Sequence, residues 1–174
     1  NQYTARGISL KGGLGNSQDG IGDISFVSDV YAAIRSLKKN PKIDQNRIAT
    51  FGNSWGGGVQ IFMTSQWYTN KVGDGEQIQA HIALAPACYM TVENPTQTST
   101  KMLMLLGEKD NWNEPGPCID YADKLNAAGG NAEVIVIPDA GHGFVKVRPK
   151  KSNKAMTWHC QVTWDPKTMM AYHK

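Results

Sequence analysis

Short apolar runs alternate with segments of helical periodicity along most of this chain, and this alternation limits the possible folds more than any other feature. Helices of about a dozen residues between apolar strands are typical of a parallel α/β sheet. The strands read as continuous apolar runs, which fits burial on both faces of the sheet. We therefore predict one parallel sheet with its strands in chain order. The four runs are RIATFG (47–52), QAHIALAP (79–86), KMLMLLG (101–107) and EVIVIP (133–138).

The helical segments show apolar residues at three- and four-residue steps. In the first of them, Asp23 is placed to cap the start of the helix. In the last, Ile119, Ala122 and Leu125 lie on one side, which predicts the buried face. The predicted helices span residues 23–40, about 55–68 and 116–130.

The stretch FGNSWGGG places Ser54 in a G-x-S-x-G pattern between a predicted strand and a predicted helix. A nucleophile elbow requires this context, because its strained turn exposes the serine hydroxyl. Strand and helix approach closely there, and Gly52, Gly56 and Gly57 supply the room. The backbone N–H of Trp55, at the positive end of the helix, is placed to bind an oxyanion. The alternative is a flexible glycine turn that happens to contain a serine.

A nucleophilic serine needs a base, and the base needs an orienting acid. Asp110 follows the strand KMLMLLG, and His142 follows EVIVIP, in the chain order serine, acid, histidine that this architecture uses. Because the carboxyl ends of parallel strands meet at one edge of a sheet, we expect Ser54, Asp110 and His142 to lie together. A surface-loop histidine is the alternative for His142, although its flanking glycines would let the loop carry the ring inward.

Four further residues are weaker candidates for a functional role. Asp139 and Glu108 are rivals of Asp110 for the role of the acid. Asp139, three residues before His142, is more plausible as a residue that stabilises the loop than as the acid. Trp112 is placed to form a wall of the substrate site, and a half-buried packing residue is the alternative. His81 begins a predicted strand and suggests no chemistry.

The composition is that of a globular protein large enough for one domain with a real core: 174 residues, 40% hydrophobic and 19% charged. No apolar run approaches membrane-spanning length. Residues 146–174 carry seven Lys and Arg and one acid, whereas residues 1–145 have a net charge of −3. The basic run VKVRPKK has no aromatic platform beside it, so we interpret it as a solvated tail and expect no nucleic-acid partner.

The cysteines, Cys88, Cys118 and Cys160, match no zinc-binding spacing. One disulfide with a free thiol and three reduced thiols are both compatible with this number. The compartment is therefore open, with a secreted or periplasmic location as one alternative. We expect neither a metal nor an organic cofactor.

The motifs NRIATFGNSWGG, LLGEKDNW…PC and VIPDAGHGF resemble those of the dienelactone hydrolase family, within the α/β-hydrolase superfamily. The resemblance runs from about residue 1 to 145. It implies an α/β-hydrolase-like, mostly parallel sheet flanked by helices. It also implies Ser54 as nucleophile, Asp110 as acid and His142 as base, acting on a small-molecule ester. The name-giving enzymes use a cysteine nucleophile, whereas this chain has a serine.

The family pattern places several strands before the elbow, and one of their loops donates a second oxyanion N–H. Ser54 is preceded here by one loop-like region and one predicted helix. We therefore expect residues 1–145 to form the C-terminal portion of an α/β-hydrolase domain, from the elbow strand onward. Residues 146–174 would be a basic tail that packs on it. A preceding segment or another chain would complete the sheet.

Overall fold

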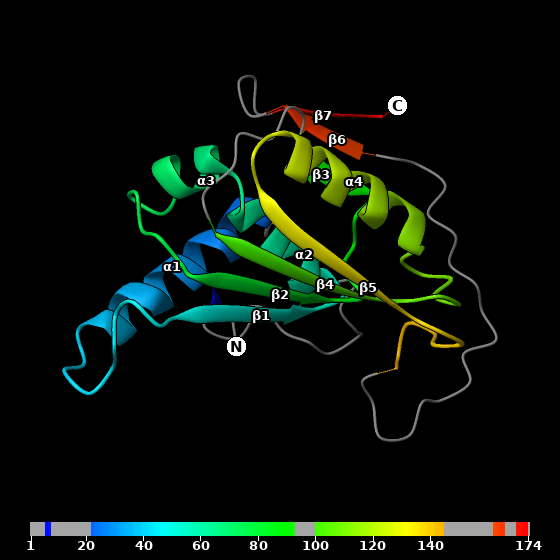
Figure 1. Ribbon diagram of the computed structural model, residues 1–174. Helices are drawn as coiled ribbons and strands as arrows, with labels where there is room; N and C mark the ends of the chain where they lie inside the picture. The colour runs from blue at the N-terminus through cyan, green and yellow to red at the C-terminus, as the bar shows by residue number, and fades with distance from the viewer. Residues whose placement is uncertain (1–5, 8–21, 93–99, 145–161, 166–169, 174) are drawn as a thin grey trace.

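Four strands form one parallel sheet whose order follows the chain, which confirms the predicted topology (Figure 1). The computed structural model describes residues 6–7, 22–92, 100–144, 162–165 and 170–173. Every strand pair in this sheet is parallel, so all the carboxyl ends lie at the same edge. In their order across the sheet the strands are β1 (Ala49–Asn53), β2 (Ala80–Leu84), β4 (Lys101–Gly107) and β5 (Asn131–Ile137).

The helices differ from the prediction in two places. Helix α1 (Asp23–Lys38) has Gly22 as its N-cap residue, so Asp23 is the first helical residue and the predicted cap is wrong. The helix predicted over about 55–68 is two helices, α2 (Trp55–Met63) and α3 (Gln66–Lys71). The break follows from local bonding, because the Thr64 hydroxyl donates to the Ile61 carbonyl at 2.7 Å and competes with the helical ladder.

Helix α4 (Pro115–Ala127) confirms the last predicted helix but corrects its buried face. Ile119 is 38% exposed, whereas Ala122 and Leu125 are buried as expected. Cys118 and Tyr121 complete the buried stripe, and burial raises the pKa of the Tyr121 hydroxyl. The inward side chains at 118, 121, 122 and 125 follow the helical repeat.

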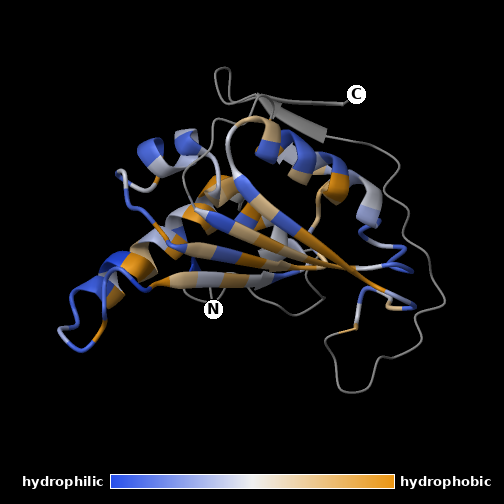
Figure 2. Cartoon of the chain, viewed as in Figure 1, coloured by the Kyte–Doolittle hydropathy of each residue, from blue (hydrophilic) through white to orange (hydrophobic). Residues whose placement is uncertain are grey.

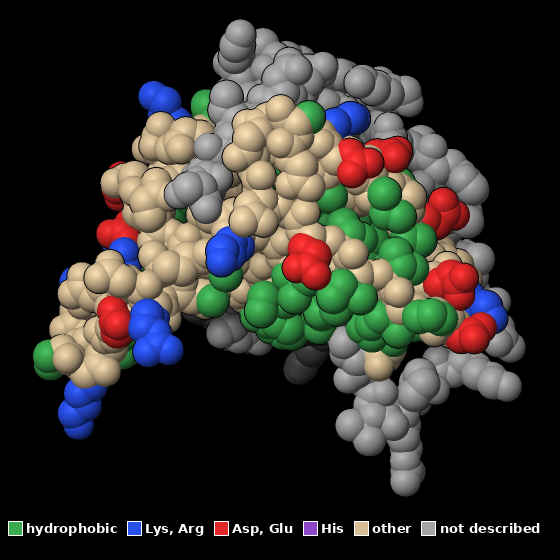
Figure 3. All heavy atoms as spheres, in the orientation of Figure 1, with side chains coloured by type: hydrophobic (Ala, Val, Ile, Leu, Met, Phe, Trp, Pro, Cys, Tyr) green, Lys and Arg blue, Asp and Glu red, His purple; other side chains and the backbone are tan. Residues whose placement is uncertain are grey.

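The sheet is well covered on one face only. Helix α2 packs on β1 and β2, and α4 packs on β4 and β5. On the face that these helices cover, alternate strand side chains such as Met104 and Leu106 are buried. The opposite face carries Phe51 and Ile135, which are 64% and 42% exposed. Hydrophobic side chains gather at the surface on the side of the molecule that Figure 3 shows, and Figure 2 gives the hydropathy along the strands in the same view. The predicted burial on both faces is therefore wrong for the described part of the chain. An apolar run shows that a face could be buried, but the covering element decides whether it is.

The hydrophobic core forms two clusters. One joins α1 to α2 and α3 and centres on Val27, Tyr31 and Phe62; the Tyr31 hydroxyl lies 3.1 Å from that of Thr69. The other fills the space between the sheet and α4. Both clusters include residues of α2, the helix that packs on β1 and β2.

A second, small sheet was not predicted. Its central strand β6 (Val162–Asp165) pairs in parallel with β3 (Met90–Val92) and antiparallel with β7 (Met170–His173). These strands have only three or four residues, which is too short for a pattern of apolar residues to predict them. The limits of the tail segment, 146–174, stay a prediction.

Candidate active site

Ser54 occupies a strained turn between β1 and α2. Its φ is +56° and its ψ is −117°, a conformation that non-glycine residues rarely adopt. The Ser54 N–H donates to the Leu84 carbonyl at 2.8 Å, which anchors the turn to the end of β2. The backbone N–H of Trp55 opens α2, where the first N–H groups of a helix have no acceptor within it. Ser54 therefore lies in a strained strand-to-helix turn whose backbone is tied to the end of β2.

Two glycines make the close approach at this turn possible. A Cβ on Gly52 would collide with the carbonyl of Gly56. A Cβ on Gly57 would lie 2.9 Å from Pro86 Cα, because the chain leaving β2 crosses directly over α2. The prediction for Gly56 itself is wrong, since a Cβ there would meet nothing within 4 Å.

The structure brings Ser54, Asp110 and His142 into one hydrogen-bonded chain. His142 Nε2 lies 2.8 Å from Ser54 Oγ, and His142 Nδ1 lies 2.8 Å from Asp110 Oδ2. The Asp110 side chain is fully buried, and that of His142 is 21% exposed. The imidazole thus bridges a buried carboxylate and a hydroxyl at the carboxyl edge of the sheet, where the sequence placed all three.

The loop after β4 fixes the Asp110 carboxylate. Oδ1 of Asp110 accepts hydrogen bonds from the backbone N–H groups of Trp112 and Asn113, both at 2.9 Å. Asn113 Nδ2 in turn donates to the Ala85 carbonyl at 2.7 Å, so the loop is tied to the segment that follows β2. The sequence analysis missed Asn113. Its position three residues after Asp110, typical of a side-chain-capped turn, was the available signal.

The rival acids have other partners. Asp139, at a φ of +58°, forms an ion pair with Lys109, and its N–H donates to Glu108 Oε2 at 2.9 Å. The Lys109 N–H donates to the Ala140 carbonyl at 2.8 Å. These contacts hold the loops after β4 and β5 together, which brings Asp110 and His142 within reach of each other.

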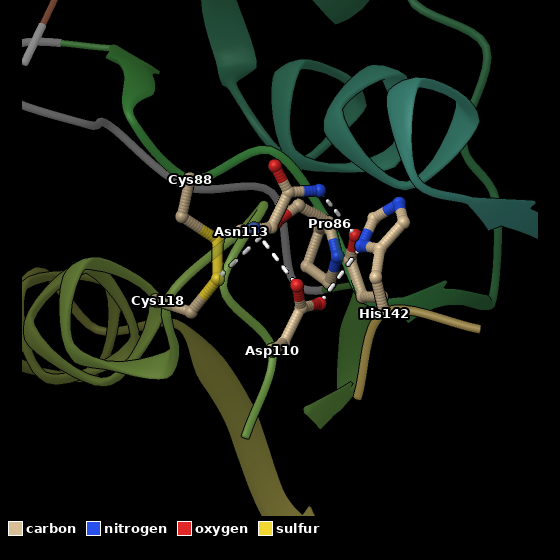
Figure 4. Close-up of a disulfide and its surroundings, with 7 residues drawn as sticks. Pro86, Cys88, Asp110, Asn113, Cys118 and His142 are labelled. Atoms are coloured by element: carbon tan, nitrogen blue, oxygen red, sulfur yellow. Dashed lines mark hydrogen bonds and ion pairs between the residues drawn. A yellow bond between two sulfur atoms is a disulfide. The ribbon is translucent and has the colours of Figure 1, made fainter. Parts of the chain in front are cut away.

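A disulfide between Cys88 and Cys118 joins the segment after β2 to the start of α4 (Figure 4). Cys88 follows β2 by a few residues, and Cys118 lies in the first turn of α4, just after the Asp110 loop. Both sulfurs are buried beside Asn113 and Pro86. The sequence left this pairing open, and Cys160 lies outside the described residues.

Trp112 lies against the imidazole. Its ring and that of His142 are stacked, with centroids 5.4 Å apart and an interplanar angle of 13°. Trp112 also lines a small hollow with Cys88 and Tyr89, among others, and that hollow includes neither Ser54 nor His142. The sequence placed Trp112 near the site but gave no sign of the stacking.

In the part of the chain that the structure describes, no group of three or more His, Cys, Asp or Glu side chains is arranged to hold a metal ion. None of the helices that the structure describes is long and apolar enough to cross a lipid bilayer.

The fold is α/β-hydrolase-like, and solved structures with this fold superpose on the chain. A candidate dienelactone hydrolase from Klebsiella pneumoniae gives a TM-score of 0.65 at 17% identity, over 86% of this chain and 66% of the other. Thermogutta terrifontis esterase 2 phosphorylated by paraoxon gives 0.60 at 18% identity, over 78% and 60%. An α/β-hydrolase from a Medee basin deep-sea metagenome library gives 0.56 at 20% identity, over 70% and 52%.

The sequence identifies the family. A profile of the dienelactone hydrolase family matches residues 18–165, and the chain belongs to this family. No curated protein matches the sequence significantly. The chain spans between 52% and 66% of the length of the three solved structures named above.

Proposed function

We propose that this chain is a serine hydrolase that cleaves carboxylic esters through an acyl-enzyme on Ser54. The observation that carries the proposal is the continuous hydrogen-bonded chain from Ser54 through His142 to the buried Asp110. The strained backbone at Ser54 adds support, because such strain persists where a function requires it. Membership of the dienelactone hydrolase family points to the same class of reaction.

In the proposed reaction, Ser54 Oγ attacks the ester carbonyl carbon while its proton passes to His142 Nε2. The oxyanion that forms binds the Trp55 N–H. The C–O bond to the alcohol then breaks, and the alcohol leaves with the proton from His142. Water then gives a proton to His142 and attacks the acyl carbon of the acyl-enzyme. The bond between that carbon and Ser54 Oγ breaks, His142 returns the proton to Ser54 Oγ, and the carboxylic acid leaves. Asp110 holds the imidazole in the required tautomer and stabilises its charged form.

These steps use only side chains and backbone groups of the protein, and we propose no cofactor. Amide cleavage and acyl transfer to another acceptor would use the same three residues. We propose esters because they are the least demanding acyl substrates for an elbow serine. A second oxyanion N–H would come from a segment or chain that completes the sheet.

A fluorophosphonate probe together with p-nitrophenyl ester hydrolysis tests the proposal. We expect the probe to label Ser54, and Ser54→Ala to lose both labelling and about 10⁴-fold or more of the ester turnover. Ser36→Ala, at an exposed position on α1, is the matched control and should keep both. A folded protein that is neither labelled nor active would instead indicate a hydrolase-fold domain that binds without catalysis.

A further inference from the structure

The turn that carries Asp110 also places an aromatic ring on the face of His142. The backbone N–H of Trp112 donates to Asp110 Oδ1, which closes the turn and directs the indole to the imidazole. The two ring centroids are 5.4 Å apart and the planes differ by 13°. Two residues of one short turn therefore contact His142: the Asp110 carboxylate at the edge of its ring and the Trp112 indole on its face.

The two hydrogen bonds of His142 oppose one motion of its ring only weakly. The bonded atoms, Nδ1 and Nε2, define a line across the ring. Within the freedom that the Cβ–Cγ bond leaves, the ring can roll about that line with little change in either distance, but the rolling moves the N–H and lone-pair directions and weakens both bonds. A parallel aromatic ring in contact opposes that roll.

The contact between the Trp112 indole and the His142 ring also affects the charged form of that ring. When the Ser54 proton reaches Nε2, the ring becomes an imidazolium, and tryptophan is the best aromatic partner for a cation within about 6 Å of its centroid. Among the residues that the structure describes, Asp110 is the charged side chain bonded to the ring. Lys109 and Asp139, on the neighbouring loops, pair with each other. The indole and the carboxylate are thus the groups that can stabilise the charged ring.

We propose that Trp112 is a positioning residue, which fixes the ring plane of His142 and stabilises its charged form during acyl transfer. The proposal rests on the proposed function, in which His142 is the base. It differs from a role as a wall of the substrate site, because a wall acts on substrate binding and a stacked ring acts on proton transfer.

Steady-state kinetics of Trp112→Leu and Trp112→Phe separate the two roles. We expect Trp112→Leu to lower kcat by roughly 3- to 30-fold with KM nearly unchanged, since only the stacked face is lost. Trp112→Phe keeps an aromatic face and should recover most of the loss. A raised KM with unchanged kcat, or a phenylalanine variant as impaired as the leucine variant, would overturn the proposal. Circular dichroism and urea unfolding show whether each variant is folded.

An NMR measurement tests the geometry without ester turnover. In protein labelled at histidine, the His142 ring signals, identified by their loss in His142→Gln, should be ring-current shifted and sharp in the wild type and in Trp112→Phe. They should move and broaden in Trp112→Leu as the ring begins to roll. Unchanged His142 signals in Trp112→Leu would refute the proposed positioning. A chain with no esterase activity would contradict the proposed function, and this comparison would still decide the role of Trp112.

Discussion

Removing the Cys88–Cys118 disulfide should destabilise this protein substantially. The bond joins residues 30 apart in the sequence. In the chain-entropy account, cross-linking a loop of that length stabilises the fold by about 3.5 to 4 kcal/mol at 25 °C, because it limits the unfolded chain. Both cysteines are buried, at 3% and 0% exposure, so replacing them with alanine also leaves space in the core under α4.

A loss of this size is a large share of the stability of a single domain, which is about 5 to 15 kcal/mol. We expect the double variant Cys88→Ala/Cys118→Ala to unfold at a urea midpoint lower by about 1.75 to 2 M or more, taking a slope of about 2 kcal/mol per M. A Cys160→Ala background prevents thiol exchange, and the background protein treated with dithiothreitol, which keeps both thiols in the core, should show the loss from the unfolded chain alone.

The disulfide should also affect the active site. It ties α4 to the segment after β2 on the far side of Asn113, whose side chain holds the Asp110 loop to Ala85. Without it we expect the ester turnover of the still-folded variant to fall by about 10- to 100-fold, as expected when a catalytic group shifts by an ångström or less. A double variant that unfolds at the same urea midpoint as the background protein would refute the reasoning.

Three further predictions follow from the structure. Asp110→Asn should lose about 10⁴-fold of the ester turnover because the histidine tautomer is no longer fixed, whereas Asp139→Asn should lose little; the reverse order would show that the wrong carboxylate was chosen. Burial lowers the pKa of His81 to about 4, so the fold holds the neutral ring. Stability should therefore be complete above about pH 6.5 and fall by up to about 3 kcal/mol as the pH drops toward 4. Urea midpoints from pH 4 to 8 would measure this, and a dependence that persists unchanged in His81→Asn would contradict it. Finally, β1 pairs only with β2 among the described strands, and Phe51 is 64% exposed beside that free edge, so we expect the isolated chain to self-associate in sedimentation velocity and Phe51→Lys to reduce it. If the wild-type chain and the Phe51→Lys variant both sediment as monomers, the prediction of self-association through this surface is wrong.

The sequence by itself determined the order of the elements and the position of the chemistry along them. A central strand of a parallel sheet is apolar over most of its length, so KMLMLLG could be recognised with its true limits. Parallel strands end at one edge, so residues just after successive strands, such as Asp110 and His142, could be expected to meet. Gly52 and Gly57, on either side of Ser54, marked a turn that leaves no room for a larger side chain at those two positions.

Tertiary structure decided what depends on contacts between distant segments. Apolar runs could not show that one face of the sheet is left partly exposed at Phe51 and Ile135, because exposure depends on which element covers the face. Cysteine spacing could not select the Cys88–Cys118 pair, because a disulfide needs two Cα atoms close in space, here 5.0 Å apart.

The stacking of Trp112 on His142 belongs to the same group. It requires the Asp110 turn to close and the loops after β4 and β5 to be tied together, and neither event is local in sequence. The residue types that perform the proposed chemistry can therefore be identified from the sequence. Their alignment to within a hydrogen bond comes from packing, because the free energy that fixes a side chain is supplied by neighbours that only the folded chain brings to it.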